Sequence, residues 1–374
     1  VSTRSGVFLP FQKLGLIVVD EEHDSSYKQD LNVPYYHTRD VALMRSKFSN
    51  STILLTSSTP SIETYYNVKN KKYSSYFLKN RYEKFLSPKI RLVNMAHEKG
   101  MFSKILIDKI RIKIEKNEKI LILQNKKGIE KGGIERVELI LKKIFPKVGI
   151  LRYDQNTTNK KDDYYKILEK FKDGEENILL GTKMISKGLD FKNITLVAII
   201  TADIGLNLPD FRSGEKIFQL IYQHIGRAGR GKKESEAIIQ SFNTDDIHIK
   251  NACRYKINES YDIIINERRE LNYPPYSRLI KILFMGGNEQ KVMEKAEHFF
   301  SILNKNKNIK LLGPSLAPIE KENSLWRYQI LIKCEKKYWQ KFHDWFNNNI
   351  SMKEFESKYK NIKVKVDVDP LSIL

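Results

Sequence analysis

The segment from Leu14 to Asp30, LGLIVVDEEHDSSYKQD, constrains the fold more than any other part of the 374-residue chain. Its apolar run, Leu16–Val19, is typical of a strand that is buried on both faces of a parallel sheet. An acidic cluster follows at once, made of Asp20, Glu21, Glu22 and His23. Ligands of such sheets bind just beyond the carboxyl ends of the strands, and Mg²⁺ bound to nucleotide phosphates prefers hard oxygen ligands. We therefore expect Asp20 to hold the metal and Glu21 to orient or deprotonate a water molecule; a solvated acidic turn is the alternative.

The charge of the chain indicates a polyanionic partner. The sequence contains 66 Lys and Arg against 45 Asp and Glu, which gives a formal net charge of +21. An excess of this size is typical of proteins that bind nucleic acid. The chain is also rich in Lys, Ile, Asn and Tyr, which AT-rich codons supply, so codon usage is an alternative source of the charge.

The sequence lacks the marks of a membrane or secreted protein. No apolar run approaches the roughly 20 residues of a membrane span, and the N-terminus does not have the layout of a signal peptide. We therefore expect a cytoplasmic protein. The two cysteines, Cys253 and Cys334, are far apart, so no disulfide framework and no C-x-x-C zinc knuckle is expected.

Three regions differ in their pattern. Residues 1–95 read as part of an α/β domain, in which a second apolar strand ends in a hydroxyl-rich turn, Ile53–Ser61. Residues 96–254 alternate amphipathic helices with apolar strands, which indicates a parallel wound sheet. Residues 255–374 combine alternating strands with two helices and predict a small α+β domain.

A second constellation lies in ENILLGTKMISKGLDF. A strand is predicted to end at Gly181, Thr182 and Lys183, and Ser186–Phe191 follows. Glycine lets the backbone approach a ligand closely, and Thr, Ser and Lys donate to phosphate oxygens. The alternative is an ordinary crossover between a strand and a helix.

A third constellation is QLIYQHIGRAGR. Arg227 and Arg230 flank Gly229 near the end of a predicted helix, with Gln223 one turn earlier. Two arginines on such a turn can act as arginine fingers, because guanidinium is permanently charged and forks onto phosphate oxygens. The alternative is a basic helix end that the helix dipole favours.

In this order, the motifs resemble those of superfamily 2 helicases. DEEH resembles motif II, Ser57–Thr59 motif III, GTKMISKGLDF motif V and QHIGRAGR motif VI. The resemblance implies an α/β protein with two RecA-like helicase lobes, the first one incomplete, followed by the small α+β C-terminal domain. It also implies ATP and Mg²⁺ as cofactors, bound between the lobes.

A tighter resemblance is to the bacterial PriA (primosomal protein N′) family. It is carried by DEEHDSSYKQD, YHTRD, TSSTPSIE, LILQNKKG, PDFRSGEKIFQL, NYPPYSRL, GPSLAPIEKENSLWRYQILIK and VDVDP. The family implies an ATP-dependent 3′–5′ DNA helicase of the primosome that recognises stalled or D-loop forks in replication restart. It also implies branched and single-stranded DNA, single-strand-binding protein and primosome proteins as partners.

The resemblance assigns roles to named residues. Tyr27–Arg39 would form an aromatic-rich loop that senses DNA, where rings stack on bases and cations bind phosphates. The residues expected to catalyse or to bind nucleotide are Asp20, Glu21, Glu22, His23, Gly188, Asp190, Gln223, Arg227 and Arg230. Those expected to contact DNA or to couple it to hydrolysis are Tyr27, Lys28, Tyr36, Arg39, Ser57, Ser58, Thr59, Asn125, Lys126, Thr182, Lys183 and Lys187.

The chain departs from the family in two places. It contains no G-x-x-x-x-G-K-[ST] phosphate loop, so little hydrolysis is expected from this chain alone. The family's cysteine-rich two-zinc module is also missing, because Ile129–Lys131 directly bridges Asn125–Gly128 to the next helix. Zinc is therefore not expected here.

These departures leave several interpretations open. The chain starts at Val1 without a methionine, and we expect either a partial gene product whose N-terminal half is encoded separately or a trimmed segment. A catalytically inactive remnant that binds DNA or a partner is the main alternative function. A different superfamily 2 translocase, RecG-like or restriction-type, is a third.

Overall fold

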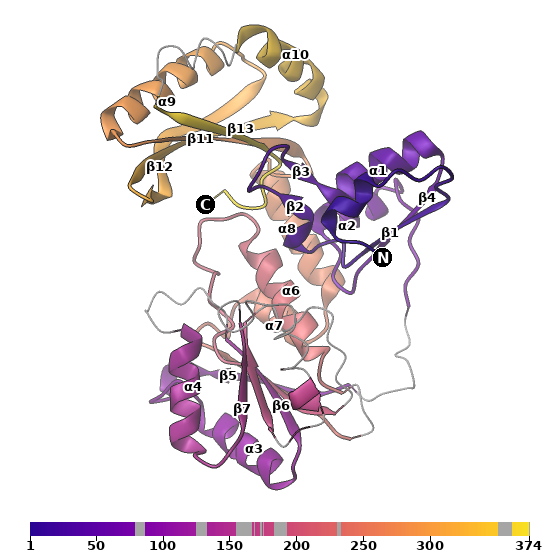
Figure 1. The fold of residues 1–374 in the computed structure, drawn as a ribbon, viewed down its shortest axis with the longest axis vertical. Helices are drawn as coiled ribbons and strands as arrows, with labels where there is room; N and C mark the ends of the chain where they lie inside the picture. The colour runs from indigo at the N-terminus through magenta and orange to yellow at the C-terminus, as the bar shows by residue number, and fades with distance from the viewer. Residues whose placement is uncertain are drawn as a thin grey trace. The chain divides into compact units, whose positions relative to one another are not determined.

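A computed structural model of the chain describes residues 1–78, 87–124, 133–154, 167, 169–172, 174, 176–182, 193–229, 233–350 and 361–373. These residues form two compact units, which are drawn in Figure 1. Unit 1 consists of Val1–Ser74, Pro209–Arg212 and Ile263–Leu374, and unit 2 of Ser75–Leu208 and Ser213–Asp262. The architecture confirms the expected fold class: a parallel α/β lobe, part of another, and a small α+β domain.

Unit 2 is built on a six-stranded parallel sheet with the order β5-β10-β9-β6-β8-β7. The strands are β5 (Lys89–Asn94), β6 (Lys119–Leu123), β7 (Ile150–Tyr153), β8 (Ile178–Gly181), β9 (Ile194–Ile199) and β10 (Glu236–Ser241). Every residue of β8 and β9 is buried, as continuous apolar runs require in a sheet covered on both faces. The helices are α3 (Lys104–Glu115), α4 (Gly133–Ile144), α6 (Ser213–Ile225) and α7 (Ile247–Cys253), with a 3₁₀ turn at Met95–His97.

The two faces of this sheet have separate cores. Ile122, Leu180 and Ala198 pack with Leu106 of α3 and Leu141 of α4 on one face. The residues next to these along each strand point to the opposite face and form the other core, which contains Leu121, Leu179, Val197, Tyr153, Phe171 and Ala228.

The predicted domain boundaries at residues 95 and 254 stay predictions. Strand β5, which precedes residue 95, pairs with β10 in the sheet of unit 2.

The N-terminal part of unit 1 contains two parallel strands, β1 (Leu16–Asp20) and β4 (Thr52–Thr56). Helices α1 (Thr38–Ser49) and α2 (Ile62–Lys69) accompany them, with a short hairpin of β2 (Lys28–Gln29) and β3 (Tyr36–His37) and 3₁₀ turns at Arg4–Phe8 and Ser25–Tyr27. Leu16 and Val18 are 55% and 52% exposed. The prediction that this strand is buried on both faces is therefore wrong for the described residues, because Leu16 and Val18 alternate with Ile17 and Val19 and their face is open.

The C-terminal part of unit 1 is an antiparallel sheet with the order β12-β13-β11-β14. Its strands are β11 (Ser277–Gly286), β12 (Ile309–Glu322), β13 (Leu325–Glu335) and β14 (Lys363–Val368), and its helices are α9 (Glu289–Leu303) and α10 (Trp339–Asn349), with a 3₁₀ turn at Lys336–Tyr338. Helix α8 (Ile257–Glu270) begins in unit 2 and ends in unit 1. In Figure 1, α9 and α10 lie on the same face of the sheet. Ile282, Phe284 and Ile330 pack there with Phe299 and Phe342.

Among the described residues, none of the helices combines the length and the apolar character that crossing a bilayer requires.

Candidate active site

Asp20 ends β1 beside the end of β4. The parallel register pairs Asp20 with Thr56, and the Thr56 hydroxyl donates to Asp20 Oδ1 over 2.6 Å. The Glu21 N–H donates to the same oxygen over 3.1 Å. Because Asp20 is exposed, its carboxylate is fixed in direction and open to a ligand.

The two glutamates of the turn have opposite environments. Glu21 has a φ of 48°, in the left-handed region that non-glycine residues rarely adopt, and its side chain is 47% exposed. Glu22 is 1% exposed: Oε1 accepts from the Ser61 N–H at 2.6 Å and Oε2 from Arg39 Nη1 at 3.0 Å. Glu21 is thus available to a water molecule, whereas Glu22 holds the start of α2.

His23 connects the acidic turn to the hydroxyl-rich turn that follows β4. Its Nδ1 lies 2.7 Å from Ser57 Oγ and 3.6 Å from Glu21 Oε2. Ser57 Oγ also accepts from the Thr59 N–H at 2.9 Å. Ser58 is exposed and Thr59 is fully buried. The structure therefore brings together the residues assigned to motifs II and III.

The predicted DNA-sensing loop folds back on the acidic turn. The Tyr27 hydroxyl donates to Asp20 O over 2.6 Å; burial, together with the negative charges of Asp20, Asp24 and Glu21, raises the pKa of Tyr27. Tyr36 is half-buried, and its ring meets Phe8 edge-on at 5.0 Å.

The two cations expected to contact DNA in this loop are engaged within unit 1. Lys28 is 5% exposed and forms an ion pair with Asp367 at 2.7 Å. Arg39 binds Glu22 and the Ser61 hydroxyl, at 3.0 and 2.7 Å. Burial opposes the charge of Arg39, but Asp40 and Glu22 outweigh it and raise its pKa. These contacts indicate that both side chains support the fold of the loop.

The residues predicted for the second lobe lie in unit 2. Gln223 is part of α6, and Arg227 follows it, with the Arg227 N–H donating to His224 O at 3.0 Å. Gly229 has a φ of 76°, which explains the glycine in this turn. Thr182 follows β8 and is 5% exposed, at the same edge as Gln124, whose N–H donates to Gly181 O at 2.9 Å.

Several predicted residues lie outside the described part of the chain. They are Asn125, Lys126, Lys183, Lys187, Gly188, Asp190 and Arg230, together with the bridge Ile129–Lys131.

Sequence reasoning missed a charged cluster around Glu63. Glu63 Oε1 lies 2.9 Å from Arg212 Nη2 and 3.1 Å from Arg268 Nη1. Burial raises the pKa of Glu63, but Arg212, Arg268 and Arg39 outweigh it and hold the pKa well below its usual range. Phe211 stacks on Tyr273 with centroids 4.5 Å apart. The PDFR segment was the available signal, because a Phe-Arg pair beside buried acids suits such a cluster.

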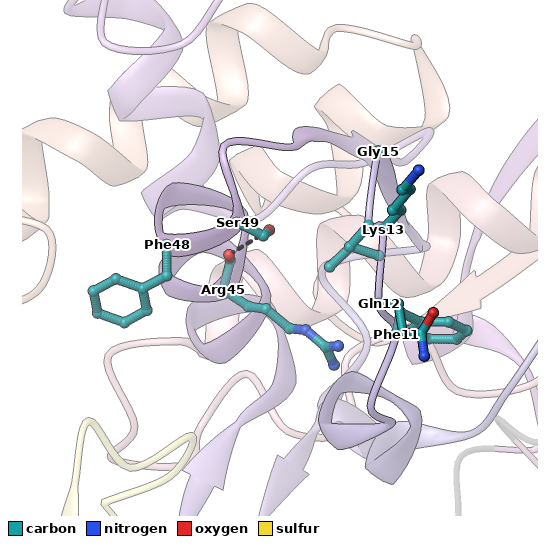
Figure 2. A pocket seen from close by; sticks show the side chains of 8 residues that line it. Phe11, Gln12, Lys13, Gly15, Arg45, Phe48 and Ser49 are labelled. Atoms are coloured by element: carbon teal, nitrogen blue, oxygen red, sulfur yellow. Dashed lines mark hydrogen bonds between the residues drawn. The ribbon is translucent and has the colours of Figure 1, made fainter.

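A pocket of about 560 Å³ lies at the other end of β1. It is lined by Phe11, Gln12, Lys13, Leu14, Gly15, Arg45, Phe48 and Ser49, and Figure 2 shows Phe48 pointing away from the segment before β1 that carries Phe11 and Gln12. Gly15 precedes β1, whereas Asp20 ends it, so a five-residue strand of roughly 16 Å separates this pocket from the acidic turn.

The donors of the acidic turn fit Mg²⁺ that arrives with phosphates. Among the residues that the structure describes, no three His, Cys, Asp or Glu side chains gather into a metal-binding group. Mg²⁺ usually keeps several waters and takes one or two protein carboxylates alongside the substrate's phosphates. The exposed carboxylate of Asp20 meets that requirement.

Comparisons with known proteins agree with the motifs. Residues 102–232 match the profile described as "Helicase conserved C-terminal domain", and residues 269–371 match "Primosomal protein N C-terminal domain". Over 437 residues the chain is 31% identical to the replication restart protein PriA of Bacillus subtilis, covering 100% of the chain and 54% of the relative. The chain belongs to the PriA family. The PriA of Rickettsia prowazekii is 32% identical over 435 residues, covering 99% of the chain and 65% of that relative.

The chain thus spans 54% and 65% of the lengths of these two PriA proteins. Among solved structures, Saccharomyces cerevisiae Dbp5 bound to RNA and ADP BeF3 has a TM-score of 0.45 and 14% identity, covering 69% of the chain and 64% of Dbp5. A likeness of this size supports no inference about function.

Proposed function

We propose that the chain is the ATPase-coupling and C-terminal part of an ATP-dependent DNA helicase that acts at forks in replication restart. The observation that carries this proposal is the arrangement of the side chains in the acidic turn. Asp20 and Glu21 are exposed at the end of a parallel strand pair, while His23 bonds to Ser57 of the following turn. Exposed carboxylates that a partly buried histidine joins to a second motif suit a site that hydrolyses a nucleotide and transmits the event to other parts of the protein.

The roles follow from exposure and chemistry. Asp20 would hold Mg²⁺, which would supply positive charge beside the phosphates. Glu21 orients or deprotonates the attacking water, which its 47% exposed side chain can reach. Gln223, Arg227 and Arg230 act on the terminal phosphate, and Gly188 and Asp190 approach the nucleotide. Glu22 positions the start of α2 through Ser61.

The finer features of the proposal come from the relatives. PriA proteins are named for replication restart, and we extend to this chain 3′–5′ movement, binding to branched and single-stranded DNA, and assembly with single-strand-binding protein and primosome proteins. A segment that carries a G-x-x-x-x-G-K-[ST] loop, in the same protein or in a separate one, is a further proposed component, because that loop cradles the β- and γ-phosphates and the 374 residues contain none.

Phosphate release with forked DNA tests the roles of Asp20 and Glu21. The chain alone is expected to hydrolyse ATP near background. With a phosphate-loop polypeptide added, turnover should rise and Glu21→Gln should lower it by at least 100-fold, while Glu294→Gln on the exposed face of α9 changes nothing. Turnover that survives Glu21→Gln contradicts the assigned role. Robust turnover by the chain alone contradicts the need for a partner.

A catalytically inactive DNA-binding protein is the second candidate. The net charge of +21 favours it, because such an excess of cations suits a polyanionic partner. It predicts an affinity for forked DNA that falls steeply with salt and is the same with and without ATP. An affinity that changes when ATP is added would favour the helicase instead.

A further inference from the structure

We propose that Lys28 is a positioning residue that ties the acidic turn to the C-terminal strand β14, and that it does not contact DNA phosphate. This inference rests on the proposed function, because it concerns how the loop that would sense DNA is connected to the carboxylates that would act on ATP. The evidence is a set of contacts within unit 1 that joins residues 340 positions apart.

The Lys28 ammonium sits in a socket of three oxygen atoms. It donates to Val368 O at 2.7 Å and to Asp369 O at 3.2 Å, and Asp367 Oδ1 lies 2.7 Å away as its ion-pair partner. An ammonium group has three donors; the two backbone carbonyls accept from two of them, and the Asp367 carboxylate balances the charge as an ion-pair partner. The side chain of Lys28 is 4% exposed and that of Asp367 12%. A phosphate could reach Lys28 only if the socket opened.

The socket belongs to the face of the C-terminal sheet that α9 and α10 leave open. Asp367 pairs with Lys281 of β11, whereas the adjacent Val366 pairs with Ile282 and packs into the helical core. Alternation along the strand therefore turns Asp367 away from that core. The register of β14 against β11 thus fixes where the Lys28 socket lies.

Lys28 is one residue away from a direct contact with the acidic turn. The neighbouring Tyr27 hydroxyl donates to Asp20 O at 2.6 Å. Two hydrogen bonds hold the segment between Asp20 and Tyr27: Asp24 Oδ1 accepts from the Ser26 N–H at 2.7 Å, and Asp24 O accepts from the Tyr27 N–H at 3.2 Å. A displacement of Lys28 should therefore also move the backbone carbonyl of Asp20, which Tyr27 contacts.

β14 also holds the hairpin at a second point. The ammonium of Lys365 donates to Asp30 O and lies 4.9 Å from the centre of the Tyr35 ring. Between these anchored residues the tip of the loop is free of the sheet: Leu31 is 83% exposed and Val33 is 78% exposed. A ligand that displaces the loop tip would therefore act on a hairpin that β14 holds through Lys28 and Lys365, and that contacts Asp20 through Tyr27.

Hydrogen exchange of the full chain tests the connection without any need for catalysis. Lys28→Met and Asp367→Asn should each raise amide exchange at least 10-fold both in residues 20–37 and in residues 363–369. Lys28→Arg should stay near wild type, because it keeps a cation in the socket. Lys291→Met, an exposed lysine of α9, is the matched control and should change neither segment. Faster exchange confined to residues 27–29 would overturn the proposal.

Binding to a fluorescein-labelled forked DNA separates the socket from a phosphate contact. A lysine bound to phosphate contributes about one unit to the slope of log affinity against log salt. We expect Lys28→Met to keep the wild-type slope, and a slope reduced by about one unit would refute the assignment. If the chain does not bind this DNA at all, the proposed function fails. The exchange experiment still tests whether Lys28 connects the acidic turn to β14. Asp367→Asn, a milder change, serves if Lys28→Met does not fold.

Discussion

At the scale of single residues, the acidic turn shows that neighbours of the same chemistry do different work. Glu21 and Glu22 are both glutamates after the same strand, yet the first is exposed and the second is buried under Arg39 and Ser61. The left-handed φ of Glu21 reverses the chain between them and sends the two side chains in different directions. The backbone of one residue thus separates a reactive carboxylate from a structural one.

This separation predicts unequal effects on stability. Glu22→Ala removes the buried ion-pair partner of Arg39, which keeps Asp40 and the Ser61 hydroxyl, and also removes the acceptor of the Ser61 N–H. Unfolding should therefore become easier by about 3–5 kcal/mol, the usual cost of breaking a buried ion pair. Glu21→Gln should change the unfolding free energy by less than about 0.5 kcal/mol. Chemical denaturation of the three proteins measures both. Equal losses would contradict the assigned environments.

His37 predicts a pH dependence of stability. Burial and the nearby Arg39 lower the pKa of His37 to about 4; Lys28 also lowers it, while Asp40 and Glu63 oppose the shift. The folded pKa lies below the unfolded value of about 6.5, so the unfolded chain binds the extra proton first. The free energy of unfolding is therefore unaffected by the titration of His37 above about pH 6.5. It falls as the pH drops toward 4, by at most about 3 kcal/mol.

The matching variant is His37→Asn. His37 Nδ1 accepts from the Arg39 N–H at 3.3 Å at the start of α1, and Asn can supply the same cap without titrating. Denaturation curves between pH 7 and pH 4 should therefore be flatter for His37→Asn than for wild type. Parallel curves would show that His37 is not the group responsible.

At the scale of elements, the β1–β4 pair has two unlike faces. Val18 and Leu54 are register partners and are 52% and 50% exposed. Val19, on the other face, is 4% exposed. Parallel strands are normally covered on both faces, so this open face is an apolar surface suited to further packing.

The open face gives a prediction about dye binding. The double variant Val18→Thr, Leu54→Thr should lower the fluorescence of an apolar-surface dye while leaving the unfolding free energy within about 0.5 kcal/mol of wild type. The control Val19→Thr buries a hydroxyl and should cost about 1–3 kcal/mol. Unchanged dye fluorescence in the double variant would show that the face is not the binding surface.

How far the sequence predicts these elements depends on the range of the contacts. The apolar runs of β6, β8 and β9 predict a parallel sheet, and the structure confirms it, because burial along a strand is encoded locally. The acidic turn is visible for the same reason. The Lys28–Asp367 pair and the Glu63 cluster were not foreseen, since each joins residues hundreds of positions apart. The sequence also does not show that Lys28 and Arg39 form ion pairs within unit 1, and their expected contact with DNA stays a prediction.

At the scale of the whole chain, unit 1 is assembled from three separate pieces of sequence. The shortest piece, Pro209–Arg212, is held by all three of its polar or aromatic side chains. Asp210 accepts from the Ser372 hydroxyl at 2.8 Å, Phe211 stacks on Tyr273, and Arg212 pairs with Glu63. Through these three side chains the four-residue piece contacts both the N-terminal and the C-terminal pieces of the unit.

Removing one ring should therefore weaken the whole unit. In addition to its stacking on Tyr273, the Phe211 ring lies under the guanidinium groups of Arg212 and Arg268, at 4.7 and 5.0 Å. We expect Phe211→Ala to lower the unfolding free energy by about 2–4 kcal/mol. Phe48→Ala, at a ring that is 80% exposed, should cost less than about 0.5 kcal/mol. Similar melting temperatures for the two variants would contradict this view of the segment.

The seat of Lys28 on the last strand has a consequence for synthesis on the ribosome. The first 74 residues of unit 1 emerge long before Asp367 is translated. At about 5–20 residues per second, the remaining roughly 300 residues take some 15 to 60 s. Throughout that interval the hairpin and Lys28 lack their contacts with β14, so we expect the N-terminal piece of unit 1 to reach its final packing only after β14 has left the ribosome.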